Sequence, residues 1–351
     1  MEHLRVGFIG CGRPWKTEGA TGFGISHDHA RGYRSVPATK IHALADIDLE
    51  NAEAFRREHG GEVVYRDYRE MLAKERLDIV SICTWPHLHA EMAIACAEAG
   101  VRAVYCEKPM APTWAEAKAM VAACEKSGTV LTFSHQRRFD PPYRKAREMI
   151  RSGRIGELLR MEMPTSNLYD WGTHWFDMMH FYNGESPAEW VLAAVEPTGG
   201  PTIFGVQMEG QGLAQIKFAN GVFGFMATGK ETGYNVQNRL VGTEGVIEIG
   251  GTGWDHLRVW SKGYSDWEDF GAIEPTHPGR GFGLAIENLV ECLETGAEPE
   301  LSAAKALRAT ELIFACYESA RNRGRVDLPL QVADSTVYAK QRRTRSDSGT
   351  G

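Results

Sequence analysis

The chain has 351 residues, of which 43% are hydrophobic and 24% charged, and a formal net charge of −7 from 39 basic and 46 acidic side chains. This length predicts two domains with substantial cores, and the ordinary composition disfavours collagen-like, coiled-coil and disordered classes. The acidic excess does not attract phosphate backbones, and no apolar run approaches the ~20 residues of a membrane span. We therefore expect neither nucleic acid nor a membrane as a partner.

The seven cysteines are odd in number and scattered, without a Cys-x-x-Cys pair. We interpret them as small buried hydrophobic side chains in a reducing cytosol rather than as a disulfide or zinc framework. The segment after Met1 leads directly into an apolar run, with no charged-then-apolar signal segment. The sequence therefore predicts a cytoplasmic protein.

The first part of the chain alternates short apolar runs with helical patterns. Strands are predicted at Leu4–Ile9, Ile41–Ala45, Asp78–Cys83, Val101–Cys106 and Thr129–Phe133, and helices at Asn51–His59, His87–Ala99 and Trp114–Lys126. Strict alternation implies right-handed crossovers and a parallel sheet covered on both faces. We therefore expect a doubly wound α/β domain over residues 1–133.

The pattern changes near residue 134. After a predicted helix near Pro142–Arg151 come closely spaced β-like runs at Leu158–Met163, Trp190–Val195, Ile203–Glu209, Leu213–Phe218, Val222–Thr228, Asn238–Gly242 and Val246–Ile249. Turn signals at Glu209-Gly210, Asn220-Gly221 and Gly242-Thr243 favour an open, mostly antiparallel sheet. With two closing helices, Gly283–Thr295 and Ala303–Asn322, this predicts a second α/β domain over residues 134–335 and a flexible tail over 336–351.

A glycine turn follows the first predicted strand. Gly10 and Gly12 flank Cys11, and glycines there let backbone N–H groups approach a pyrophosphate at a helix N-terminus. The turn departs from G-x-G-x-x-G because Trp15 stands at the third glycine position, and the long stretch that follows delays the next helix to near His27.

An acidic residue ends the second predicted strand. The carboxylate of Asp46 is placed to accept hydrogen bonds from ribose hydroxyls and to repel a 2′-phosphate. The sequence therefore predicts NAD as the cofactor, while Arg13 and Arg34 leave NADP open.

A lysine follows the fifth predicted strand in Glu107-Lys108-Pro109. Loops at the carboxyl ends of parallel strands form the ligand crevice of such sheets. Lys108 could there orient a substrate hydroxyl and supply positive charge as an alkoxide develops. The alternative is a solvated lysine before a proline that begins a helix.

A histidine and an aspartate lie near the start of a helix predicted from Thr173. Asp170 could hold one imidazole nitrogen of His174 and leave the other to take an alcohol proton as hydride leaves the adjacent carbon. A histidine satisfied in a polar core is the alternative. His174, Asp177 and His180 are spread around the helix, and His87 and His89 lack a third ligand nearby, so no metal site is predicted.

These motifs together resemble the glucose–fructose oxidoreductase / inositol dehydrogenase (Gfo/Idh/MocA) family. The resemblance runs from about residue 4 to 330, and the Glu-Lys-Pro and Asp-x-x-x-His motifs are its most specific part. It implies a Rossmann domain, a C-terminal α/β domain whose large sheet forms homodimers or homotetramers, NAD(P), and a sugar, polyol or cyclitol substrate.

The resemblance also implies residue roles. Gly10, Gly12 and Asp46 would hold the dinucleotide, with Thr84, His89 and Glu107 lining its nicotinamide end. Lys108 would orient the reacting hydroxyl, with a cis peptide before Pro109, and His174 would be the acid/base with Asp170 as its partner. Arg138 would lie near the substrate. Apart from the resemblance, Trp171 flanks the proposed base in the sequence, where it could stack on a sugar ring.

Two departures bear on the substrate. The Arg13–Gly24 loop is about ten residues longer than is usual in the family, and Trp85-Pro86 stands where relatives tend to have Pro-Asn. The function predicted is hydride transfer between nicotinamide and a secondary hydroxyl or ketone. An NAD-dependent glycosidase that oxidises transiently and eliminates, and a non-catalytic NAD-sensing regulator, are the alternatives.

Overall fold

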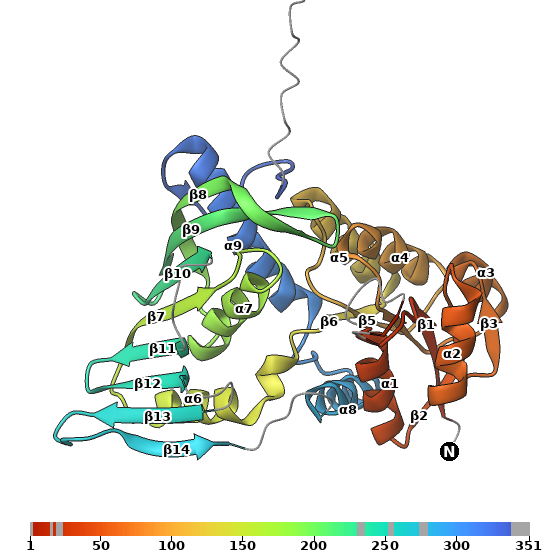
Figure 1. Ribbon diagram of the computed structural model, residues 1–351, viewed down its shortest axis with the longest axis horizontal. Helices are drawn as coiled ribbons and strands as arrows, with labels where there is room; N and C mark the ends of the chain where they lie inside the picture. Colours follow the sequence, from red (N-terminus) through yellow and green to blue (C-terminus); the bar gives the residue numbers. More distant parts are fainter. Residues whose placement is uncertain are drawn as a thin grey trace, which may run out of the picture.

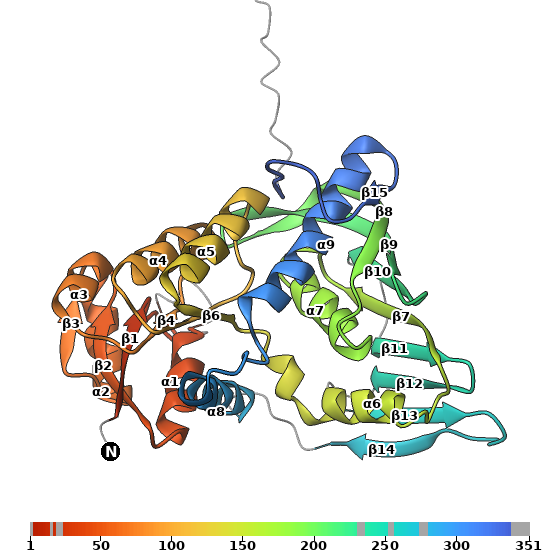
Figure 2. The same cartoon turned by 180° about the vertical axis from the view of Figure 1, so that it is seen from behind.

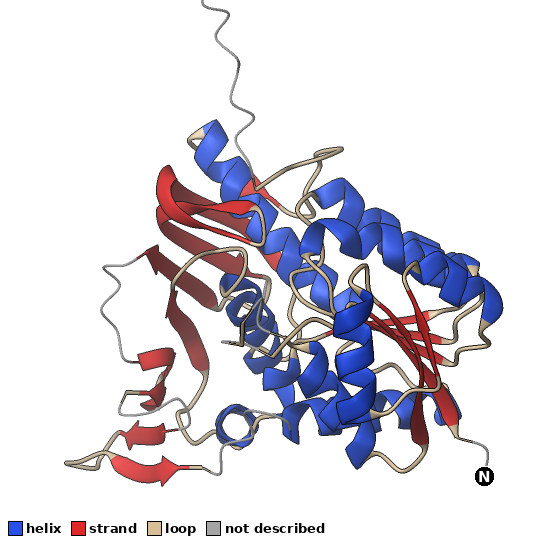
Figure 3. Ribbon diagram, turned by 45° about the vertical axis from the view of Figure 1, so that its right-hand side comes forward, coloured by secondary structure: helices blue, strands red, loops and turns tan. Residues whose placement is uncertain are grey.

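Two β-sheets, each with its own helices, form the part of the chain that the computed structural model describes, which is residues 3–14, 17–18, 24–229, 236–251, 256–273 and 280–337. Figure 1 shows the two sheets side by side, with helices packed around and between them. Figure 3, coloured by secondary structure, shows one face of the second sheet left without helices.

The first sheet is parallel throughout, in the order β3-β2-β1-β4-β5-β6. Its central strands are almost entirely buried, because helices cover both faces. This confirms the predicted doubly wound architecture. The strands are β1 (Leu4–Ile9), β2 (Thr39–Ala45), β3 (Val63–Tyr65), β4 (Ile79–Ile82), β5 (Ala103–Cys106) and β6 (Val130–Phe133).

The crossover helices begin and end at residues with recognisable capping chemistry. The side chain of Asp48 accepts from the N–H of Glu50 at the start of α2, and Thr113 accepts from Glu116 at the start of α5. α5 ends at Gly128, which has a φ of 76°. The helices are α1 (Ser26–Ser35), α2 (Leu49–His59), α3 (Tyr68–Lys74), α4 (Pro86–Glu98) and α5 (Trp114–Ser127). β3 and α3 were not predicted, because segments this short carry no clear periodicity.

The second sheet is mixed, in the order β14-β13-β12-β11-β7-β10-β9-β8-β15. Among the described strands of this second sheet, only the β7–β10 pair is parallel, so the mostly antiparallel prediction is confirmed. The strands are β7 (Leu158–Thr165), β8 (Ala188–Ile203), β9 (Val206–Phe218), β10 (Phe223–Gly229), β11 (Val236–Gly242), β12 (Gly245–Gly250), β13 (His256–Ser261), β14 (Glu268–Ala272) and β15 (Val326–Asp327).

One hairpin differs from the prediction. The predicted strand Ile203–Glu209 is wrong, because the chain turns at Phe204-Gly205, between β8 and β9. The predicted turn at Glu209-Gly210 is wrong as well, because both residues lie inside β9. Glu209 is buried, and its carboxylate accepts from Thr228 Oγ1 (3.0 Å) and Tyr317 Oη (2.8 Å). A buried hydrogen-bonded glutamate cannot be distinguished from a turn residue by composition.

Helices cover one face of the second sheet and also tie it to the first. α7 (Gly172–Tyr182) and α9 (Ala303–Asn322) pack against the sheet, and α6 (Pro141–Arg151) follows the short 3₁₀ helix η1 (Gln136–Phe139). α8 (Arg280–Thr295) instead returns to the first half of the chain, where it lies along α1 (Figure 2). A Cβ on Gly32 of α1 would lie 3.1 Å from a backbone carbon of Phe282 in α8, so a glycine there favours the close approach of the two helices.

The first residues of the predicted tail are packed. Thr336 pairs with Thr113 in an isolated β-bridge, and Val337 is buried. The rest of that prediction, residues 338–351, lies outside the described residues. No helix in the described part of the chain is long and apolar enough to cross a membrane.

Candidate active site

A cavity of about 610 Å³ lies at the carboxyl ends of β1, β4 and β5. Its lining comes from both halves of the chain: the glycine turn and α1, the loops after β4 and β5, η1, the start of α7 and the β8–β9 turn. Ligands of open α/β sheets bind at this edge of the sheet. The cavity contains Gly12, Thr84, Glu107, Lys108, Asp170, Trp171 and His174 from the predicted site.

The glycine turn meets the condition for a close backbone approach. Gly10 has a φ of 85°, and a Cβ there would lie 2.9 Å from the carbonyl oxygen of Cys83. Gly12 has a φ of 55°. The N–H groups of Cys11 and Gly12 donate to Asp46 Oδ2 (2.7 and 3.1 Å), whereas the sequence led us to expect them to face a pyrophosphate. Asp46 thus holds the turn in shape, and its Oδ1 accepts from the N–H of Asp48 (2.9 Å).

The long loop between β1 and α1 closes on another glycine. Gly24 has a φ of 63°, and a Cβ there would lie 2.4 Å from the carbonyl oxygen of Arg13. It lies just before α1, and its close neighbours are Arg13 and Pro14 at the start of the loop. Only a glycine therefore lets these two parts of the loop approach each other this closely. Trp15 of the same loop lies outside the described residues.

Glu107 is buried behind Lys108 and is held by a histidine that sequence reasoning missed. His29 of α1 is fully buried and hydrogen-bonds Glu107 Oε1 through Nε2 (2.8 Å) and Ser81 Oγ through Nδ1 (2.7 Å). Burial raises the pKa of Glu107, but the hydrogen bond and charge of His29, together with Lys108, outweigh it and lower this pKa. Nothing local in the sequence marked His29, because its partners lie 52 and 78 residues away.

Lys108 is paired with Asp170 across the cavity. Its Nζ lies 2.8 Å from Asp170 Oδ1, and the aspartate side chain is only 4% exposed. The peptide bond before Pro109 is cis, as the resemblance implied. The prediction that Asp170 holds His174 therefore differs from the structure, where the carboxylate binds the lysine. Asn167 positions Asp170, because its Oδ1 accepts the N–H of Asp170 (2.6 Å).

His174 lies on the first turn of α7, facing the cavity and 4% exposed. Its ring centroid is 5.8 Å from that of His135 and 6.2 Å from that of Trp171. His135 is itself buried, and it hydrogen-bonds Thr173 Oγ1 (3.0 Å). Burial lowers the pKa of His135 despite the nearby carboxylate of Asp177. His174 and Lys108 thus both line the cavity, and His135, which does not, packs against His174.

Of two adjacent arginines, Arg137 lines the cavity, and Arg138, the predicted substrate contact, does not. Arg138 is fully buried, and its guanidinium makes a bidentate ion pair with Asp177 (2.7 and 2.8 Å). It also donates to Glu185 and Glu300. The guanidinium of Arg137 instead lies 5.6 Å from the Trp171 ring centroid. Arg138 therefore lies away from the cavity where it was predicted to be, because η1 turns successive side chains in different directions.

The residues after β4 divide between cavity wall and supporting layer. Thr84 lines the cavity, but His89 is fully buried and lies within hydrogen-bonding distance of the carbonyls of Thr84 (3.0 Å) and Pro109 (2.9 Å). His89 therefore braces two cavity loops rather than lining the cavity, contrary to the prediction. Trp85 is 38% exposed, and its ring centroid lies 6.2 Å from that of Phe204 on the β8–β9 turn.

Comparisons with known proteins match both halves of the chain. The model of an oxidoreductase family's NAD-binding Rossmann fold matches residues 4–135, and that of the same family's C-terminal alpha/beta domain matches residues 162–328. A solved structure of levoglucosan dehydrogenase in complex with NADH and levoglucosan has the same fold, with a TM-score of 0.79 at 24% identity, over 93% of this chain and 100% of that one.

Similar sequences include several named dehydrogenases. Levoglucosan dehydrogenase of Pseudarthrobacter phenanthrenivorans is 28% identical over 392 residues, with 94% of this chain and 99% of that protein covered. The scyllo-inositol 2-dehydrogenase (NAD(+)) of Bacillus subtilis is 26% identical over 361 residues, with 96% and 99% covered. D-apiose dehydrogenase of Paraburkholderia graminis is 35% identical over 156 residues, which span 44% of this chain and 38% of that protein.

Proposed function

From the membership of this chain in the Gfo/Idh/MocA oxidoreductase family, we propose that it is an NAD(P)-dependent dehydrogenase or reductase acting on a secondary hydroxyl or ketone of a sugar, cyclitol or sugar derivative. The full-length similarity to levoglucosan and scyllo-inositol dehydrogenases supports this substrate class. The observation that carries the proposal is the placement of Lys108, Asp170 and His174 in the same cavity as the glycine turn.

The residues present fit a dinucleotide. Gly12, with a φ of 55°, lines the cavity just before α1, and Asp46 directly follows β2, the place where the acidic residue of a dinucleotide-binding domain meets a ribose hydroxyl. When bound, the nicotinamide supplies the hydride acceptor or donor. Asp46 disfavours a 2′-phosphate, so we propose NAD as the preferred cofactor.

The protein's own residues divide the remaining chemistry. Asp170 holds the ammonium of Lys108 in the cavity, and Lys108 orients the substrate hydroxyl and stabilises the negative charge that develops on its oxygen. His174 takes the hydroxyl proton, because a neutral imidazole suits this task near pH 7. Thr84 and Glu107 support the cofactor end, while Trp171 and Arg137 offer contacts for the ring and hydroxyl groups of the substrate.

The test is turnover with a panel of sugars, cyclitols and their keto forms, measured as NADH formation or loss. Lys108→Ala and His174→Ala are expected to lower kcat by about 10²–10⁴-fold with NAD binding retained. No turnover with any panel member, or an undiminished rate in Lys108→Ala, would contradict the proposal. Release of an aglycone from a chromogenic glycoside without net NADH would instead indicate the glycosidase reaction.

We further propose a homodimer or homotetramer that assembles through the helix-free face of the second sheet. Supporting this, Leu192 and Leu213 on that face are 45% and 64% exposed, and a groove of about 1030 Å³ runs between them and β7, β10 and β11. Exposed apolar surface of this kind is typical of protein–protein contacts.

We also propose a division into a dinucleotide-binding unit over residues 1–133 and a substrate and assembly unit over residues 134–335, with α8 packed on the first unit. Limited proteolysis with and without NAD tests this division. A cytoplasmic location is supported by the free thiols of all seven cysteines, which lie within the described residues. Fractionation of cells that produce the chain tests the location.

A further inference from the structure

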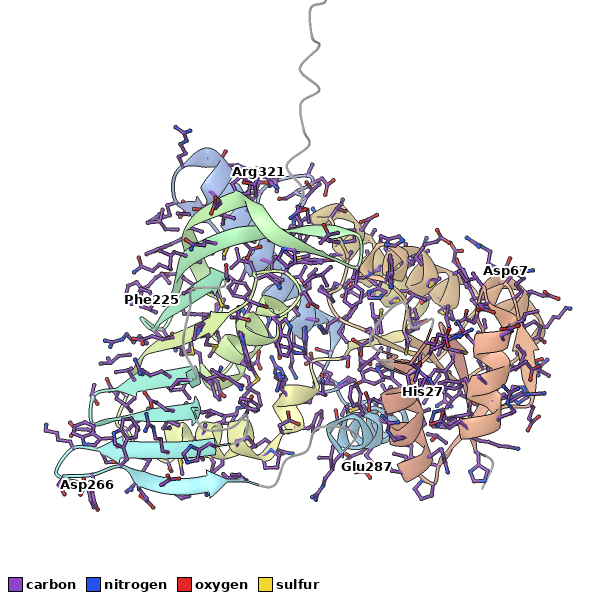
Figure 4. All side chains as sticks on the ribbon, in the orientation of Figure 1. His27, Asp67, Phe225, Asp266, Glu287 and Arg321 are labelled. Carbon is purple, nitrogen blue, oxygen red and sulfur yellow. The ribbon has the colours of Figure 1, made fainter. Side chains whose placement is uncertain are left out.

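Three metal-ligating side chains converge where α1 meets α2, on the wall of the cavity. His27 belongs to the first turn of α1, and Glu58 and His59 are the last two residues of α2. His27 Nδ1 and His59 Nε2 lie 2.7 Å apart. Glu58 Oε2 lies 3.5 Å from His27 Nδ1, and Glu58 Oε1 lies 3.3 Å from His59 Nε2. His27 and Glu58 line the same cavity as Gly12 (His27 is labelled in Figure 4).

The three residues can each direct one donor atom at a single metal ion, because these atoms lie within 4.8 Å of one another. Bonds of ~2.0–2.1 Å in a tetrahedral arrangement place donor atoms about 3.3 Å apart. The two carboxylate oxygens of Glu58 lie near this distance from one imidazole nitrogen each, so a rotation of the carboxylate would bring one oxygen into reach of both. The two imidazoles would separate by about 0.6 Å, a small adjustment of side-chain torsions, to reach the same spacing.

The two imidazole rings are held in place by a buried aromatic side chain. Phe55 is fully buried, and its ring centroid lies 5.1 Å from that of His27 and 4.7 Å from that of His59. Both histidines are more than nine-tenths buried. Within the described part of the chain, His27 Nε2 and His59 Nδ1 have no hydrogen-bond partner. Two buried imidazoles that share one hydrogen bond are poorly compensated for their lost hydration, whereas a metal ion would use a lone pair of each.

The two arginines near this cluster bind groups other than the Glu58 carboxylate. Arg31 pairs with Asp28, and Arg34 donates to the backbone carbonyl of Glu58 (3.4 Å) rather than to its carboxylate. His59 also ends α2, and the carbonyl dipoles of a helix C-terminus favour a cation.

We propose that His27, Glu58 and His59 form a binding site for a divalent transition metal ion of the zinc class. Two imidazoles and one carboxylate are the donor set of open zinc sites, in which the fourth ligand comes from solvent or a bound molecule. Here that position is supplied from the cavity side, because His27 and Glu58 both line the cavity. The site is separate from Lys108 and His174, and it does not depend on the hydride-transfer function.

The test uses the full chain without an affinity tag, freed of metal by a chelator. Zn²⁺ is titrated in competition with a chromophoric chelator, and Co²⁺ serves as a spectroscopic probe of four-coordinate geometry. We expect one Zn²⁺ per chain with a Kd of about 1 µM or tighter. His27→Ala and His59→Ala are expected to weaken binding by at least about tenfold, because each removes one of three protein ligands.

Two controls keep the result interpretable. His3→Ala removes an exposed histidine of the same half of the chain and is expected to bind zinc as the parent does. Glu58→Gln changes a side chain that is 52% exposed, so this variant is expected to fold. It therefore tests the third ligand even if the variants of the buried histidines fail to fold. Absence of saturable Zn²⁺ binding, or equally tight binding by Glu58→Gln and the folded histidine variants, would overturn the proposal.

Discussion

Arg137 and Arg138 are neighbours in the chain but have different surroundings. Both are buried, but Arg137 faces the cavity and stacks on the rings of Trp171 and Trp175, with its guanidinium carbon 5.6 and 5.1 Å from their centroids. Arg138 is enclosed, and it neutralises Asp177. Burial raises the pKa of Asp177, but the charge and hydrogen bonds of Arg138, together with the neighbouring His135, outweigh it and lower this pKa. One arginine therefore lines the cavity, and the other lies within the protein interior, where it stabilises the fold.

Replacing each arginine by methionine separates these roles. Arg137→Met keeps the apolar stacking and is expected to raise KM by about 10–100-fold, since a charged hydrogen bond is worth about 1.5–3 kcal/mol. Arg138→Met leaves Asp177 as an uncompensated buried charge and is expected to lower the free energy of unfolding by about 3–5 kcal/mol. Steady-state kinetics and urea denaturation of both variants check this. If the two variants changed KM equally and also changed the free energy of unfolding equally, the separate roles of Arg137 and Arg138 would be contradicted.

His29 is the buried residue on which the ionisation of Glu107 depends most directly. His29→Phe keeps a ring against Tyr105, whose centroid lies 4.5 Å from that of His29, but removes the bond to Glu107. The pKa of Glu107 should then rise, because burial is no longer opposed by His29. We expect the acidic limb of the pH profile of kcat/KM to move to higher pH. His3→Ala is the control, and an unmoved limb in His29→Phe would show that Glu107 ionisation does not govern activity.

At the scale of elements, α7 joins the candidate site to the core of the second half. All its residues, from Gly172 to Tyr182, are buried, since it lies between the sheet and the neighbouring helices. Its first turn carries His174 into the cavity, and its last turn places His180 against Phe218 of β9, with ring centroids 5.5 Å apart. A helix buried on every side fixes the position of a catalytic side chain more firmly than a surface loop would.

Burial of α7 predicts a dependence of stability on pH. Burial lowers the pKa of His180 to about 4, from 6.5 in an exposed histidine. Between these values the unfolded chain binds the proton and the folded protein does not, so stability is complete above pH 6.5 and falls as the pH drops towards 4. The parent should lose about 3 kcal/mol of its free energy of unfolding between pH 7 and pH 4 because of His180. His180→Asn can still donate to the carbonyl of Ser186 but does not titrate, so it should not show this loss. Denaturant unfolding at pH 7 and pH 4 measures this, and equal losses in both proteins would contradict it.

At the scale of the whole molecule, the second sheet has one face against helices and one open face. Phe225, labelled in Figure 4, lies on the open face with Leu192 and Leu213. Leu213→Asp places a charge on this face and should increase the fraction of monomer. Light scattering would detect this as a lower average mass. Leu49→Asp, a comparably exposed position on α2, is the control. A monomeric parent protein, or an unchanged mass for Leu213→Asp, would contradict assembly through this face.

Much of the fold follows from local sequence patterns. Apolar runs of Val, Ile and Ala, helical spacing and glycine stops identified most strands and helices of the first sheet, because each signal is written within a few residues. The Gly10 turn, Asp46 at a strand end and the Glu-Lys-Pro motif indicated the cavity for the same reason. The β8–β9 turn was misplaced because Glu209 is polar for its long-range partners, Thr228 and Tyr317, rather than for solvent.

By itself, the sequence determined the class of fold, the position of the glycine turn, and the lysine and histidine proposed for the reaction, since these depend on local patterns and motifs. Only the tertiary structure decided which side chains meet. It paired Asp170 with Lys108, gave Glu107 its partner His29, turned Arg137 rather than Arg138 to the cavity, and brought His27 to His59. Most of these contacts join residues that are distant in sequence, and the side chains of Arg137 and Arg138 differ in the direction in which they point. Both features are selected by tertiary packing and not by local sequence.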